Sequence, residues 1–99
     1  MASSHIYSFA ELQAMIRPLV EKYGMKGARL FGSYARSEAR AESDIDVLLD
    51  GGSNFRALDV FALAEELHER SGKSVDVYEL SELDPGAFRQ TVLREAVAL

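Results

Sequence analysis

The length, composition and charge of this 99-residue chain limit the classes of protein to which it can belong. A hydrophobic fraction of 47% predicts one globular domain over residues 1–99, with a small core. The sequence has no cysteine, which excludes disulfides and thiolate metal sites and favours the cytoplasm. A net charge of −5 argues against direct binding of nucleic acid. No apolar run approaches the roughly 20 residues that span a bilayer, and we expect no secretion signal at the start of the chain.

The first half of the chain predicts a helix followed by short strands. Ser8 and Glu11 match a capping box, and apolar residues at helical spacing extend the predicted helix to Tyr23. Pro18 falls inside this pattern and is expected to kink or locally break the helix. The remaining elements expected in this half are a strand over 28–31, a helical turn or two over 34–39 and a strand over 45–50.

The second half predicts a helix, a strand and a final helix. Ser53 or Asn54 can cap a helix with a broad apolar face that ends at Gly72, and a third strand follows over 74–78. Asp84 as cap and Pro85 at the first helical position predict the last helix. Its expected buried face consists of Phe88, Val92 and Ala96. This order predicts an α/β (α+β) domain with a small mixed sheet of three to four strands, backed by helices.

Three aspartates are predicted to share one face of the sheet. Side chains two residues apart on a strand point to the same side, so Asp44 and Asp46 lie opposite the apolar residues around them. The same alternation on the third strand places Asp76 on that side. If the two strands are neighbours, the three carboxylates converge. Such a cluster suits Mg²⁺, which favours carboxylate and phosphate oxygens, and two such ions can serve a phosphoryl transfer.

A Gly-Ser turn lies just before the two paired aspartates. Glycine at position 32 lets the backbone approach a phosphate, while Ser33 offers a hydroxyl and an N–H at the start of a helical turn. An ordinary strand-to-helix turn explains the pair equally well, and both readings can hold together. The chain has no Gly-x-x-x-x-Gly-Lys-Ser/Thr sequence, which excludes a P-loop NTPase. Asp50, at the end of the same strand as Asp46, is interpreted as a turn residue.

Taken together, these motifs resemble the nucleotidyltransferase superfamily. The similar segments are Gly-Ser-Tyr-Ala-Arg at 32–36, Ser-Asp-Ile-Asp-Val-Leu-Leu at 43–49 and Val-Asp-Val at 75–77. More narrowly, the chain is similar to the minimal (MNT-type) members, which are the antitoxins of HEPN/MNT toxin–antitoxin modules. The resemblance covers residues 27–78 and implies a nucleotidyltransferase-like fold.

The resemblance also implies a role for each matching residue. Gly32 and Ser33 would hold the β- and γ-phosphates of ATP, while Asp44 and Asp46 would bind Mg²⁺. Asp76 would be the third carboxylate, a metal ligand that also helps to deprotonate the attacking hydroxyl.

Two further positions concern the same loop. Arg36 matches the arginine of the family motif and can pair with a phosphate or with a carboxylate. The family usually has glycine at the next position, where this chain has Ser37.

The leading hypothesis is a Mg²⁺-dependent nucleotidyltransferase that moves AMP from ATP to a protein hydroxyl. The resemblance implies that the acceptor is a tyrosine of a HEPN-type ribonuclease toxin, which AMPylation would silence. An alternative is a non-catalytic binding module that neutralises its partner by occlusion, for which the net negative charge would suit a basic partner. A metal-dependent phosphodiesterase is a third hypothesis, against which the absence of an obvious histidine ligand counts.

Overall fold

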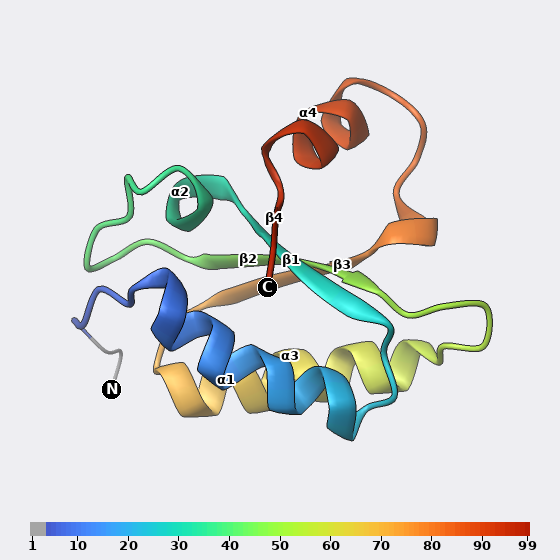
Figure 1. Cartoon of the computed structure of the whole chain (residues 1–99), viewed down its shortest axis with the longest axis horizontal. Helices are drawn as coiled ribbons and strands as arrows, with labels where there is room; N and C mark the ends of the chain where they lie inside the picture. Colours follow the sequence, from blue (N-terminus) through green and yellow to red (C-terminus); the bar gives the residue numbers. More distant parts are fainter. Residues whose placement is uncertain (1–3) are drawn as a thin grey trace.

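The computed structural model describes residues 4–99, which form a four-stranded sheet with helices on both faces (Figure 1). The strands are β1 (Gly27–Phe31), β2 (Ile45–Asp50), β3 (Val75–Glu79) and β4 (Val97–Ala98). The helices are α1 (Phe9–Lys22), α2 (Gly32–Ala35), α3 (Ala57–Ser71), the 3-10 helix η1 (Leu80–Glu82) and α4 (Ala87–Glu95). None of these helices is long and apolar enough to cross a membrane.

The sheet has the strand order β3-β2-β1-β4. Strand β1 is antiparallel to both β2 and β4, whereas β2 and β3 are parallel. The prediction of a small mixed sheet backed by helices is therefore confirmed. The prediction did not include β4, which adds two residues at one edge of the sheet. The opposite edge is β3.

Helices α1 and α3 lie side by side beneath the sheet, while α2 and α4 lie on its other side (Figure 1). The larger core fills the space between the sheet and the first pair of helices. It contains Leu12, Ile16, Leu19, Met25, Leu30, Tyr34, Ile45, Val47, Leu49, Leu63 and Leu67. A smaller cluster on the other face contains Phe31, Leu48, Leu83 and Val92. We call the face of the sheet that packs against α1 and α3 the helix-covered face. The opposite face, on the side of α2 and α4, is called the open face.

The start of α1 agrees with its sequence. The Ser8 hydroxyl accepts a hydrogen bond from the Glu11 N–H, and the Glu11 carboxylate accepts one from the Ser8 N–H. The helix continues through Pro18, so the predicted local break does not occur. Pro18 is exposed, and water can satisfy the carbonyl that the missing N–H leaves without a partner.

The predicted caps of α3 and α4 are wrong. Helix α3 begins after Arg56 rather than at Ser53 or Asn54 because Phe55 packs against Gly51 and the larger core before the helix starts. At its other end, Gly72 is left-handed with φ of 70°, as predicted for a helix end.

Helix α4 begins after Gly86, so Asp84 does not cap it. Its packing residue is Val92, which is 2% exposed, whereas Phe88 is 55% exposed rather than buried. Phe88 makes an edge contact with the ring of Tyr78 on the open face instead. Ala96 is partly buried against the smaller cluster.

Candidate active site

The parallel pairing of β2 and β3 places two carboxylates opposite each other. In the register of these two adjacent strands, Asp46 pairs directly with Asp76. Both lie on the open face, because Ile45 and Val47 turn into the larger core. Asp46 is half-buried and Asp76 is exposed. The structure thus brings these two together as the strand alternation predicts.

Asp44 lies one residue before the start of β2 rather than within it. Its position is therefore set by the preceding loop and not by the sheet. Asp44 is exposed, yet its charge still acts on Asp46. The three predicted carboxylates form one electrostatic group, in which two are fixed by strand pairing and one by a loop.

The environment of Asp46 disfavours its ionised form. The pKa of this carboxyl is raised from 3.8 to about 6, first by burial and then by the negative charges of Asp76 and Asp44. A hydrogen bond with Asp76 raises this pKa as well, whereas the positive charge of Arg36 lowers it. A bound cation would relieve the repulsion and hold all three groups ionised.

Gly32 begins α2 directly beside the carboxylate of Asp46. Its φ of 72° is left-handed, and a Cβ at this position would overlap Asp46 Oδ2 and lie 3.0 Å from Asp46 Cγ. Any other residue would therefore be strained and would displace the carboxylate. The glycine at this turn is explained by its close approach to the candidate metal ligand.

The donor set at this site fits Mg²⁺ in its chemistry. Oxygen ligands from carboxylates are those that Mg²⁺ takes, and Mg²⁺ completes its coordination with water and substrate phosphate oxygens. Within residues 4–99, no three acidic, histidine or cysteine side chains are already arranged to hold a metal ion. Two carboxylates on adjacent strands and a third on a loop match a site that the substrate's own oxygens would complete.

The phosphate-binding candidates lie next to this group. Ser33 is half-buried in the first turn of α2, which follows Phe31 without any side-chain cap. Arg36 ends the same turn, and its guanidinium donates to Glu95 of α4 at 3.1 Å and lies 3.5 Å from Glu38. In this structure Arg36 therefore has carboxylate partners.

The residue after Arg36 has an unusual backbone conformation. Ser37 has a φ of 58°, and it is the one non-glycine residue with positive φ within residues 4–99. A left-handed conformation costs a non-glycine residue about 1–2 kcal/mol. Glycine, which the family resemblance leads us to expect here, would adopt this φ without that cost.

Lys73 is a candidate positioning residue that the sequence analysis missed. Its side chain is buried, and Nζ donates to the carbonyl oxygen of Ala41 at 2.6 Å. The neighbouring Ser74 carbonyl accepts from the N–H of Ile45, at 2.9 Å. These bonds tie the start of β3 to the loop that carries Asp44. A lone lysine between Gly72 and a strand carries no sequence signal of such a role.

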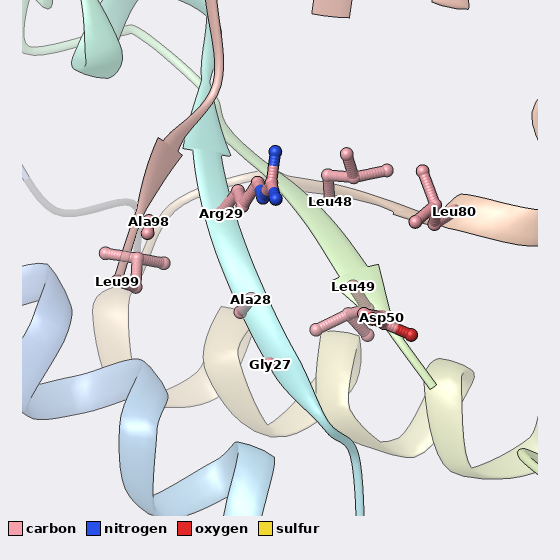
Figure 2. Close-up of a pocket in the computed structure, with 9 residues that line it drawn as sticks. All are labelled: Gly27, Ala28, Arg29, Leu48, Leu49, Asp50, Leu80, Ala98 and Leu99. Carbon is pink, nitrogen blue, oxygen red and sulfur yellow. The ribbon is translucent and has the colours of Figure 1, made fainter. Parts of the chain in front are cut away.

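A separate pocket of about 250 Å³ lies at the far end of the sheet. Figure 2 shows Arg29 projecting from β1 on the same side as Leu48 and Leu80, with Ala98 of β4 nearby. Asp50 lines this pocket and accepts the N–H of Gly52 at 3.0 Å, as expected of a turn residue. None of the three candidate carboxylates lines it.

Comparison with known families decides the class of this protein. The family model described as "Polymerase beta, Nucleotidyltransferase" matches residues 14–99. The chain belongs to this nucleotidyltransferase family. A Methanocaldococcus jannaschii protein that is provisionally named a protein adenylyltransferase is 41% identical over 87 residues, which are 88% of this chain and 92% of the relative.

Solved structures share the fold of this nucleotidyltransferase. One described provisionally as a minimal nucleotidyltransferase has a TM-score of 0.77 and 33% identity, over 94% of this chain and 97% of the other. The resemblance to minimal nucleotidyltransferases and the predicted fold are thereby confirmed, and so is the prediction of a nucleotidyltransferase enzyme.

Two complexes show the same fold at lower identity. A toxin–antitoxin crystal structure with AMP-PNP has a TM-score of 0.75 and 22% identity, over 87% of this chain and 70% of the other. The structure of a tri-AMPylated Shewanella oneidensis HEPN toxin in complex with an MNT antitoxin has a TM-score of 0.63 and 19% identity, over 90% of this chain and 66% of the other. At this identity the likeness concerns the fold.

Proposed function

We propose that this chain transfers AMP from ATP to a tyrosine hydroxyl of a HEPN-type partner protein and thereby acts as an antitoxin in the cytoplasm. The observation that carries this proposal is the pairing of Asp46 with Asp76 beside the Gly32 turn. Membership of the nucleotidyltransferase family supports the reaction class. The name of the Methanocaldococcus jannaschii relative supports protein adenylylation, and the complex of a HEPN toxin with an MNT antitoxin supports the partner.

The candidate residues divide into metal ligands and phosphate-binding groups in this proposal. Asp44, Asp46 and Asp76 would hold Mg²⁺, in a site for two ions. Mg²⁺ supplies charge neutralisation for the phosphates and orients them for displacement. The Gly32 backbone and the Ser33 hydroxyl would hold the β- and γ-phosphates of ATP.

The chemical step is a displacement at the α-phosphorus. The acceptor oxygen forms a bond to this phosphorus, the bond to the α,β-bridging oxygen breaks, and pyrophosphate leaves. The proton of the acceptor hydroxyl passes to the carboxylate of Asp76, which is exposed on the open face and can approach an acceptor from solvent.

Arg36 would contribute to phosphate binding by leaving its carboxylate partners and pairing with the triphosphate of ATP. Its partners Glu95 and Glu38 are at the surface, and an exposed ion pair is worth only about 0–1 kcal/mol. The triphosphate of ATP offers a higher local charge than either carboxylate. The exchange would also free Glu95 and loosen α4 from the turn.

Label transfer tests this proposal directly. The chain is incubated with the product of the adjacent gene, Mg²⁺ and ATP labelled at the α-phosphate. Transfer of label to a tyrosine of that product, located by mass spectrometry, is the expected result. Asp46→Asn should lower the rate by about three orders of magnitude, equivalent to roughly 4 kcal/mol. Asp50→Asn, on the same strand and face, is the matched control and should retain the rate.

Two results of the label-transfer experiment would contradict the proposal. A tight complex without label transfer, unaffected by Asp46→Asn, would identify the chain as a binding module that acts by occlusion. Label on a small molecule or on nucleic acid instead of the protein would overturn the proposed acceptor.

A further inference from the structure

A groove of about 450 Å³ lies between α3 and the edge strand β3. Its walls are largely apolar, formed by Val60, Phe61 and Ala64 on the helix and by Val75 and Val77 on the strand. Phe61 is 65% exposed, and contiguous exposed apolar patches mark interaction sites on proteins. The neighbouring Leu58, one helical turn earlier on α3, is 71% exposed. The groove therefore extends into an apolar surface that this chain leaves open to solvent.

The strand that borders the groove has one unpaired edge. Within the described chain β3 pairs with β2 alone, because it stands at the end of the strand order. Its sequence, Val-Asp-Val-Tyr-Glu, contains neither a lysine nor a proline, and Asp76 is its one exposed charged residue. Such an edge can pair with an extended segment of another protein, while an adjacent groove takes its side chains.

The same groove reaches the candidate active site. Asp76 lines the groove and is also the register partner of Asp46. A segment bound along β3 would therefore pass the carboxylate that is proposed to accept the proton of the acceptor hydroxyl. The pocket at the far end of the sheet, by contrast, is lined by none of the three candidate carboxylates.

The charge of the groove indicates the character of its occupant. The two charged residues that line it, Glu65 and Asp76, are both acidic, and the whole chain carries a net charge of −5. A segment with apolar side chains flanked by basic residues would match the walls and the charge together.

We propose that the groove between α3 and β3 is the docking site for the acceptor protein, which inserts an apolar segment with basic flanks and presents its hydroxyl beside Asp76. This inference rests on the proposed AMP transfer for the identity of the occupant. The groove sets the affinity for the acceptor, and the carboxylates and the Gly32 turn set the affinity for the nucleotide. The two affinities are therefore separable by substitution.

The test uses Phe61→Glu, measured by calorimetry for binding of the adjacent gene's product. We expect the dissociation constant to rise at least tenfold and the KM for this acceptor to rise with it, while the KM for ATP stays unchanged. Glu65→Lys should weaken binding in the same way, and added salt should weaken binding to the unmodified chain. Val97→Glu places the same charge on an exposed apolar position at the opposite edge of the sheet, and it should leave the dissociation constant unchanged.

Two further measurements keep this test independent of folding and of the proposed function. Each variant is first melted with and without Mg²⁺ and ATP. A melting temperature and a ligand-induced rise equal to those of the unmodified chain show that the variant folds and binds nucleotide. Asp46→Asn should still bind the acceptor, so a failure of AMP transfer leaves the docking test intact. Unchanged acceptor binding by Phe61→Glu, or an equal loss in Val97→Glu, would overturn the docking site.

Discussion

The two faces of the sheet come from the same strands but carry opposite properties. On the helix-covered face, Ile45, Val47 and Leu49 are fully buried beneath α1 and α3. On the open face, Asp46 alternates with those apolar side chains along β2, and Asp76 lies opposite it on β3. The first face gains stability from apolar burial, whereas the second holds like charges together and loses some stability in doing so. Stability and proposed chemistry are thus assigned to opposite sides of one sheet.

The largest expected effect comes from the helix-covered face. Leu63 of α3 is 0% exposed, and Leu63→Ala should lower the free energy of unfolding by roughly 2–5 kcal/mol through lost burial and a residual cavity. Phe61→Ala, on the exposed side of the same helix, should change it by only about 0.5 kcal/mol. Urea denaturation of both variants measures the difference. Equal losses would contradict the assignment of the two sides of α3.

A smaller loss is expected where Lys73 ties the start of β3 to the loop that carries Asp44. Lys73→Met removes the hydrogen bond to the Ala41 carbonyl and should cost about 1–3 kcal/mol of stability. The loop over residues 37–44 should also exchange its amide hydrogens faster, because it loses its tie to the start of β3. Lys26→Met, at an exposed lysine, serves as the control. Unchanged exchange in the loop would show that Lys73 does not position it.

The destabilising effect of the half-buried, repelled Asp46 carboxylate on the open face should appear in the pH dependence of stability. The pKa of Asp46 in the folded protein, about 6, lies above its ordinary value of 3.8. The ionised carboxylate therefore destabilises the fold above pH 6, and this penalty fades as the pH falls from 6 toward 4. Without metal, Asp46→Asn should be more stable than the unmodified chain by about 1–2 kcal/mol at pH 8, after allowance for solvent screening.

Comparing the stability of Asp46→Asn with that of the unmodified chain at two pH values isolates the contribution of the Asp46 carboxylate. The advantage of Asp46→Asn should shrink between pH 8 and pH 4.5, in urea denaturation with a metal chelator present. An advantage that stays constant over this range would mean that the carboxylate is not under the predicted repulsion.

The smallest effect concerns the loop beside the site. Ser37→Gly should raise the free energy of unfolding by about 0.5–1 kcal/mol, because glycine adopts the observed φ of 58° without strain. Ser37→Ala keeps a Cβ and should bring no gain. Thermal denaturation of the two variants distinguishes backbone strain from loss of the hydroxyl, since only the former predicts that they differ.

The sequence predicted those features that depend on local periodicity. Strand alternation placed Asp46 and Asp76 on one face, and the capping box located the start of α1 at Ser8. The predicted caps at Ser53, Asn54 and Asp84 were wrong, since α3 begins after Arg56 and α4 after Gly86. For α3, the tertiary contact of Phe55 with the larger core moves the helix start. Local propensity does not contain that information.

Other features were beyond the reach of sequence patterns. Strand β4 has only two residues, so alternation cannot identify it. The burial of Lys73 depends on a carbonyl 32 residues earlier in the chain, and no pattern around the lysine indicates that contact. The exposure of Phe61 and Phe88 on helices with apolar faces likewise follows from which elements pack against them.

Binding of Mg²⁺ and ATP to the unmodified chain and to Asp46→Asn, followed by the melting temperature, tests the division between the two faces most directly. A ligand at 100 times its dissociation constant stabilises a protein by about 2.7 kcal/mol, which is several degrees for a domain of this size. The account predicts that Asp46→Asn melts higher than the unmodified chain without ligand, yet gains nothing from Mg²⁺ and ATP. An Asp46→Asn variant that melts lower without ligand, or that gains as much as the unmodified chain on binding, would contradict it.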